Sequence, residues 1–152
     1  MPKKTFPDFE LPATSNLTFR LSDQRGHAAV VYFYPKDNTP GCTTEGQNFR
    51  DLYADFRKVK CSIFGVSRDS LKSHENFKVK MKFPFELISD AEEIACKLFD
   101  VVKMKNMYGR QVRGIVRSTF VFDADGVLAR EWRGVKVPGH AEEVLEFVKS
   151  IK

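Results

Sequence analysis

Cysteine is scarce in this sequence. The 152 residues contain 3 cysteines, at positions 42, 61 and 96, and no pair has the C-x-x-C spacing. Their odd number and wide separation argue against a secreted disulfide scaffold and favour a reducing compartment. The 3 histidines are distant in sequence from the cysteines and from one another. We therefore expect no zinc or other metal site, and no cofactor.

Long apolar runs are also absent. None approaches the roughly 20 residues that cross a bilayer, although 42% of the residues are hydrophobic. The N-terminus has two lysines, Lys3 and Lys4, with no apolar segment behind them, which is unlike a secretory signal. We expect one domain over residues 1–152, in the cytoplasm and not bound to a membrane.

Neither the basic nor the acidic residues are clustered in one segment of the chain. Lys and Arg number 25 against 20 Asp and Glu, a net charge of +5, and the basic residues are scattered through amphipathic segments. The densest group, Lys78, Lys80 and Lys82, has the pattern of a surface helix end rather than a nucleic-acid-binding module. We expect no nucleic-acid partner, and a monomer, because no long exposed apolar strand is evident.

Apolar runs bounded by turn residues predict strands, and amphipathic stretches between them predict helices. The expected strands cover residues 28–34, 59–66, 85–88, 118–122 and 127–132. The expected helices cover residues 43–57, 69–81, 91–99 and 140–151. This order predicts an α/β three-layer sandwich with a mixed sheet, parallel at first and antiparallel near the end. The stretch 101–116 is expected to be an irregular loop that forms a functional wall.

Cys42 stands at the head of an expected helix. The chain leaves a buried strand at Pro35 and turns at Pro40 and Gly41. The unpaired N–H groups and positive dipole of a first helical turn favour the thiolate, which is the nucleophilic form of cysteine. Cys42 and Phe49, seven residues apart, share a helix face, so the thiol is expected to point toward the protein body. The alternative for Cys42 is a small buried apolar residue.

The same segment carries a resemblance to a known family. Pro35, Thr39 and Cys42 match the P-x-x-x-[TS]-x-x-C signature of peroxiredoxins, and residues 39–43 resemble the bacterioferritin comigratory protein / peroxiredoxin Q branch. Residues 7–9, 106–109 and 117–121 are similar to that branch as well. The resemblance implies a thioredoxin-like fold and an antioxidant, thiol-dependent peroxidase acting in cell redox homeostasis. Its substrates would be hydrogen peroxide and organic hydroperoxides, with Cys42 as the redox-active, peroxidatic residue that becomes a sulfenic acid.

The resemblance also implies roles for neighbouring residues. The Thr39 hydroxyl would touch sulfur and peroxide, and Pro35 would shield the thiolate. Arg117 would lie against the sulfur and hold a peroxide oxygen through its fixed donors. The alternatives are an N-cap or turn hydroxyl, a strand-ending proline and a solvated arginine.

Three further residues are expected to support the pocket. Glu45 would pair with Arg117 or cap the helix. Met107 and Tyr108 would wall the pocket.

The sequence departs from the family at the two familiar positions for a resolving cysteine, which hold Gln47 and Lys78. Cys61 lies on an apolar strand face and is expected to be a core residue. Cys96 falls roughly 130° from the centre of its helix's apolar stripe, which predicts a place at the exposed rim. We predict a one-cysteine cycle, in which the partner is an external thiol from a thioredoxin- or glutaredoxin-like protein or a small molecule.

Three alternatives remain open from the sequence. Cys96 could act as the resolving residue of a two-cysteine cycle. A thiol-disulfide oxidoreductase of the same fold would need a second cysteine beside Cys42, which is missing. A non-catalytic binding domain would have no need of Pro35, Thr39, Cys42 and Arg117 together.

Overall fold

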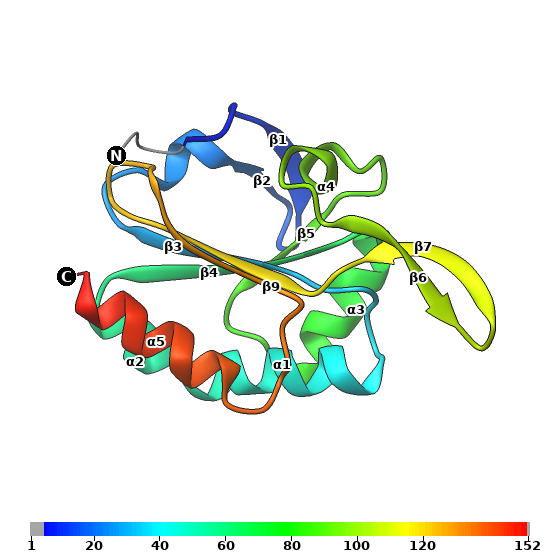
Figure 1. The fold of residues 1–152 in the computed structure, drawn as a ribbon. Coiled ribbons are helices and arrows are strands. Elements are labelled where there is room, and N and C mark those ends of the chain that lie inside the picture. The colour runs from blue at the N-terminus through cyan, green and yellow to red at the C-terminus, as the bar shows by residue number, and fades with distance from the viewer. Residues whose placement is uncertain (1–4, 152) are drawn as a thin grey trace.

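The fold is built on a mixed sheet of seven strands in the computed structural model, which describes residues 5–151 (Figure 1). Their spatial order is β2-β1-β5-β4-β3-β8-β9. The strands are β1 (Glu10–Ala13), β2 (Leu17–Arg20), β3 (Ala28–Phe33), β4 (Cys61–Ser67), β5 (Glu86–Ser89), β8 (Ser118–Phe122) and β9 (Leu128–Arg133). The strands β3, β4 and β5 are parallel, whereas β1 joins β5, β8 joins β3 and β9 joins β8 antiparallel. The predicted mixed sheet is confirmed.

Helices cover both faces of the sheet and complete the predicted three layers. One face carries α1 (Pro40–Asp51), α2 (Tyr53–Lys58), α3 (Leu71–Met81) and α5 (His140–Ser150), and the other carries α4 (Ile94–Leu98) and the 3-10 turn η1 (Leu21–Gln24) (Figure 1). Within residues 5–151, no helix is both long and apolar enough to span a membrane.

Strand β3 is buried along its whole length because each of its faces meets a separate core. Val30 and Tyr32 belong to the core beneath α1, α2, α3 and α5. Val31 and Phe33 belong to the core beneath α4 and the N-terminal strands. This two-sided burial explains the continuous apolar run of residues 28–34.

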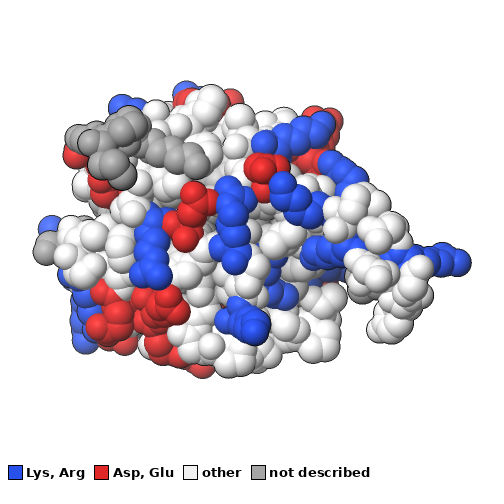
Figure 2. Space-filling view, viewed as in Figure 1, with Lys and Arg blue, Asp and Glu red and all other residues white. Residues whose placement is uncertain are grey.

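The expectation of an irregular loop over residues 101–116 is wrong. Strands β6 (Val102–Met107) and β7 (Arg110–Ile115) form an antiparallel hairpin that projects from the sheet (Figure 1). Its two-residue turn, Tyr108 and Gly109, has φ of 53° and 79°, as a tight hairpin turn requires. The alternation of apolar and polar residues that indicates a strand is weak in this segment, because β7 is exposed on both faces over most of its length. The hairpin contains four basic and no acidic residues, and basic side chains lie among uncharged ones on the projection at the right of Figure 2.

Helix boundaries also differ from the expected ones. The helix expected over residues 43–57 begins at Pro40 and is interrupted at Leu52, whose backbone leaves the helical region. Proline at the first helical position lacks only an N–H that would have had no partner, so the earlier start is natural. Helix α3 begins at Leu71, where the Ser70 hydroxyl accepts a hydrogen bond from the N–H of Ser73 at 3.1 Å.

The N-terminal hairpin of β1 and β2 was not expected from the sequence. Each strand has only four residues, and Pro12 lies inside β1. Such short strands carry too few alternations to be recognised. Strand β1 pairs with β5 and β2 pairs with β1, which extends the sheet on the side away from Cys42.

Candidate active site

Cys42 is the third residue of α1 and only 2% exposed. Its helix starts after Thr39, whose extended backbone occupies the N-cap position. Cys42 shares a core cluster with Phe49 and Phe56, so the predicted orientation toward the protein body is confirmed. The thiol therefore lies under the first turn of α1, beyond the carboxyl end of β3.

Arg117 approaches this thiol from the residue preceding β8. Its Nη2 donates to the Cys42 sulfur at 3.4 Å, while its Nη1 donates to Oε1 of Glu45 at 2.6 Å. The approach is close to the backbone as well, because a Cβ on Gly41 would lie 3.0 Å from Nη2. Glycine at position 41 thus leaves room for the guanidinium beside the sulfur.

Glu45 lies one turn after Cys42 and is buried. Burial raises the pKa of Glu45 to about 7, although the charge and hydrogen bond of Arg117 lower it. Its second oxygen, Oε2, is buried and finds no hydrogen-bond partner among residues 5–151. The expected pairing of Glu45 with Arg117 is confirmed, and it holds the guanidinium in place beside Cys42.

Thr39 and Pro35 lie in the loop between β3 and α1. The Thr39 hydroxyl donates to the carbonyl of Lys36 at 2.8 Å, which leaves its oxygen able to accept another hydrogen bond. Pro35 is half-buried and follows the end of β3 by two residues. Their contacts with thiolate and peroxide remain predictions.

Comparison with known proteins agrees with this geometry. The model of the AhpC/TSA family matches residues 2–131. The chain belongs to the AhpC/TSA family. Its activity is that of a peroxiredoxin, a thiol-dependent peroxidase.

The similarity to known peroxiredoxins extends over almost the whole chain. "Peroxiredoxin Bcp" of Xanthomonas campestris pv. campestris is 51% identical over 99% of this chain and 93% of its own length. "Peroxiredoxin Bcp" of Bacillus subtilis is 46% identical over 95% of this chain and 92% of its own. A solved structure of the X. campestris bacterioferritin comigratory protein has a TM-score of 0.90 at 50% identity, covering 94% of this chain and 91% of that one. The predicted resemblance and the thioredoxin-like fold are confirmed.

The hairpin of this peroxiredoxin contradicts the expected role of Tyr108 in the pocket wall. Tyr108 is fully exposed at the hairpin turn, so it does not line a pocket. The side chain of Met107 lies outside the described part of the structure.

The half-buried Lys105 of the same hairpin was overlooked in the sequence, and its ammonium donates to the Ile115 carbonyl. Burial and the positive charge of Arg117 lower the pKa of Lys105, whereas Cys42 raises it.

All three cysteines of this peroxiredoxin lie in the described part of the chain, and none forms a disulfide. Cys61 begins β4 and is buried, as predicted. The expectation that Cys96 lies at an exposed rim is wrong, because Cys96 is completely buried. Helix α4 spans only five residues and turns Ala95 and Cys96 inward, while Ile94 is 41% exposed. Of the apolar stripe expected from the sequence, Ala95 and Phe99 are buried but Ile94 is not, and the buried face includes Cys96 instead.

The environment of Cys96 keeps its thiol protonated. Burial raises the pKa of Cys96 well above its usual range, and the negative charge of Asp90 adds to this effect. The Asp90 carboxylate also accepts from the Cys96 N–H at 2.8 Å. A protonated, buried thiol is a poor nucleophile.

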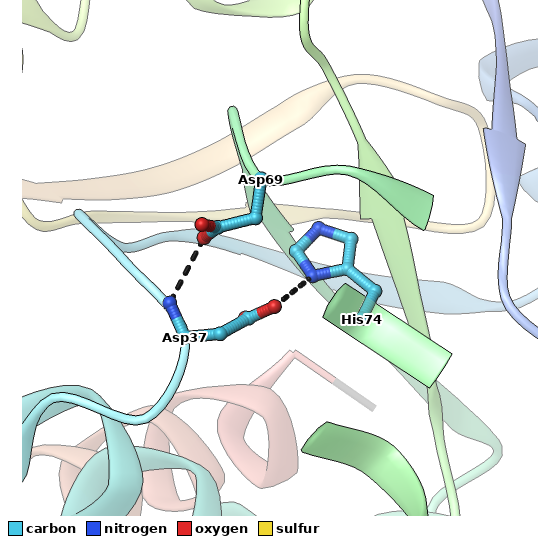
Figure 3. A group of neighbouring side chains, drawn as sticks. All are labelled: Asp37, Asp69 and His74. Atoms are coloured by element: carbon cyan, nitrogen blue, oxygen red, sulfur yellow. Dashed lines mark hydrogen bonds and ion pairs between the residues drawn. The ribbon is translucent and has the colours of Figure 1, made fainter. Parts of the chain in front are cut away.

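A buried polar cluster borders the loop that precedes Cys42. Oxygen and nitrogen atoms of Asp37, Asp69 and His74 lie within 4.8 Å of one another (Figure 3). They are engaged in hydrogen bonds to protein groups, so we assign no metal to them. The sequence contained one signal for this cluster, the spacing of His74 and Phe77, which places both residues on the buried face of α3. It indicates burial but not the partner of the histidine.

Proposed function

We propose that Cys42 is the peroxidatic residue and that Arg117, Thr39 and Pro35 form its catalytic surroundings. The observation that carries the proposal is the 3.4 Å hydrogen bond from Arg117 to the Cys42 sulfur. A guanidinium stays charged at every relevant pH and offers several fixed donors. It can therefore stabilise the thiolate and the negative charge that develops on the peroxide.

The peroxide step is a displacement at oxygen. The Cys42 thiolate attacks the terminal oxygen of ROOH, an S–O bond forms and the O–O bond breaks. The electron pair leaves as RO⁻, which takes a proton from water to give an alcohol or, from hydrogen peroxide, water. Cys42 is oxidised to a sulfenic acid and the peroxide is reduced.

The substrates in this proposal are hydrogen peroxide and organic hydroperoxides. The X. campestris relative at 50% identity is described by its alkyl peroxide reduction activity, which supports organic hydroperoxides. The small exposure of Cys42 supports access by the peroxide end of a molecule rather than by a bulky electrophile. The role is antioxidant defence.

Resolution proceeds through an external thiol in this proposal. R′SH attacks the Cys42 sulfenic acid, an S–S bond forms and water leaves; a second thiol then releases reduced Cys42. Gln47 and Lys78 occupy the familiar resolving positions, and Cys61 and Cys96 are both buried, which supports this route. The reductant is a thioredoxin-like protein, a glutaredoxin-like protein or a small thiol.

We also infer that the chain acts as one domain, as a monomer, in the cytoplasm. The few, widely spaced cysteines support a reducing compartment. The single sheet that joins the first and last strands supports one folded unit.

One experiment tests the peroxide step. Pre-reduced protein is mixed with one equivalent of hydrogen peroxide, and thiol loss and intact mass are followed. We expect rapid gain of one oxygen atom at Cys42 in the wild type and in a Cys61→Ser/Cys96→Ser double variant. Exchange with disulfides but not with peroxide would indicate an oxidoreductase instead, and inertness would indicate a binding domain.

The same double variant tests the resolution step. With an external thiol supplied, most of the turnover of the wild type should remain. If the oxidised wild type forms a Cys42–Cys96 bond and the double variant stops after one turnover, the cycle uses two cysteines.

A further inference from the structure

Asp37 belongs to the loop between β3 and α1, and its buried carboxylate contacts α3. Its Oδ1 accepts a hydrogen bond from the hydroxyl of Tyr34 at 2.6 Å, and its Oδ2 accepts one from Ser73 at 2.8 Å. Oδ2 also lies 2.7 Å from Nδ1 of His74 (Figure 3). Both members of this pair have almost no exposed side-chain surface.

The partners of His74 determine where its protons are. Nε2 lies 2.9 Å from the carbonyl oxygen of Ile88, and a carbonyl can only accept, so Nε2 carries a proton. Nδ1 faces a carboxylate that already receives two hydroxyl protons, so Nδ1 donates as well. Both ring nitrogens thus face acceptor oxygens, an arrangement that fits a buried imidazolium–carboxylate pair.

This pair fastens the loop that leads to Cys42. Asp37 lies five residues before Cys42, and its backbone N–H donates to Oδ2 of Asp69 at 2.9 Å. Asp69 also accepts from the hydroxyl of Ser67, at the end of β4, at 2.6 Å. Through side chain and backbone together, Asp37 joins the loop to α3 and to the β4 end.

We propose that Asp37 and His74 are positioning residues that lock this loop in the conformation needed for peroxide reduction. The closed loop places Cys42 beside Arg117 and leaves the residue only 2% exposed. A thiol carried on a larger molecule needs more room at the sulfur than a peroxide end does. Release of the lock therefore slows the peroxide step and speeds thiol attack on the sulfenic acid; this second effect rests on the external-thiol route proposed above.

The test compares Asp37→Asn and His74→Gln with the wild type in two single-turnover measurements. The first is the rate at which hydrogen peroxide oxidises Cys42; the second is the rate at which 2-mercaptoethanol consumes the sulfenic acid. A displacement of the reacting groups by about 1 Å can cost on the order of a hundredfold in rate. We expect the peroxide rate to fall by roughly ten- to a hundredfold and the thiol rate to rise.

Ser70→Ala is the matched control, because it removes the N-cap of α3 and leaves both members of the pair in place. It should leave the ratio of the two rates unchanged. If the two rates fall together in Asp37→Asn, or if Ser70→Ala reproduces the change in their ratio, the lock does not exist.

Two further measurements keep the proposal testable if Asp37→Asn fails to fold. Ser73→Ala removes a single donor to Asp37 and should shift the ratio in the same direction by a smaller factor. Nitrogen-15 resonances of His74 in the reduced protein at pH 7 should show both ring nitrogens protonated, and an unprotonated Nδ1 would overturn the ion pair.

Failure of the external-thiol route would be seen separately. In that case the wild type itself would form an intramolecular disulfide and would leave 2-mercaptoethanol unused. The peroxide rates of the variants would still decide whether Asp37 and His74 position the loop.

Discussion

The guanidinium of Arg117 donates to the sulfur of Cys42 at 3.4 Å although the residues are 75 positions apart in the chain. The contact is set by the sheet, because β8 pairs with β3 and Phe33 lies opposite Ser118. Helix α1 follows β3, and Arg117 immediately precedes Ser118, so both groups reach the same edge of the sheet. A change that separates them removes the main positive charge from the thiol.

Replacing Arg117 with methionine should slow peroxide reduction strongly. Loss of one donor aimed at developing charge costs on the order of a hundredfold or more in rate. The measurement is the single-turnover oxidation of Cys42 by hydrogen peroxide. Arg113→Met is the control, because Arg113 pairs with Glu93 beside α4 rather than with the catalytic thiol, and it should leave the rate nearly unchanged. A kinetically silent Arg117→Met would refute the role assigned to this residue.

Glu45 should make stability depend on pH near neutrality. Burial raises the pKa of Glu45 to about 7 from an ordinary 4.5, so the folded protein holds this proton more tightly than the unfolded chain does. The resulting stability is fully present below pH 4.5 and is lost as pH rises through 7.

The comparison variant is Glu45→Gln, which does not titrate. Between pH 4.5 and 8, the free energy of unfolding of the wild type should fall by about 3 kcal/mol more than that of Glu45→Gln. Urea unfolding at several pH values measures the difference. Parallel curves for the two proteins would contradict the prediction.

His140 should produce the opposite dependence in acid. Its Nε2 lies 2.8 Å from the Thr119 hydroxyl, and burial lowers the pKa of His140 to about 4. The unfolded chain takes up a proton near 6.5, so this contribution to stability is present above that pH and is lost as pH falls through 4. Relative to His140→Gln, the wild type should lose about 3 kcal/mol between pH 7 and pH 4. An equal loss in both proteins would show that His140 is not the acid-sensitive group.

Adding one methyl group at Gly46 should destabilise the protein. A Cβ there would lie 2.3 Å from Cζ of Phe83, whose ring is buried in the same core as Cys42. Overpacking of this kind costs roughly 1 to 3 kcal/mol. Thermal unfolding of Gly46→Ala measures the cost, with the exposed Thr44→Ala in the same helix as control. A second substitution, Phe83→Leu, should recover part of the loss, and a failure to do so would place the strain elsewhere.

The sequence alone determined the elements whose pattern reports their own burial. The run at residues 28–34 is apolar throughout because both faces of β3 are covered, and this identified the central strand. The Cys42–Phe49 spacing showed that the thiol faces inward, since a helix repeats every 3.6 residues. The peroxiredoxin signature indicated the thiol chemistry because its residues lie close together in the chain.

Tertiary structure decided which elements meet. Cys96 was expected at a rim, but a five-residue helix has too few positions to define its buried face, and α4 turned this thiol into the core. The contacts of Cys42 with Arg117 and of Asp37 with His74 join segments 75 and 37 residues apart. Periodicity describes burial along one element, whereas such contacts depend on strand order, register and the place where each loop leaves the sheet.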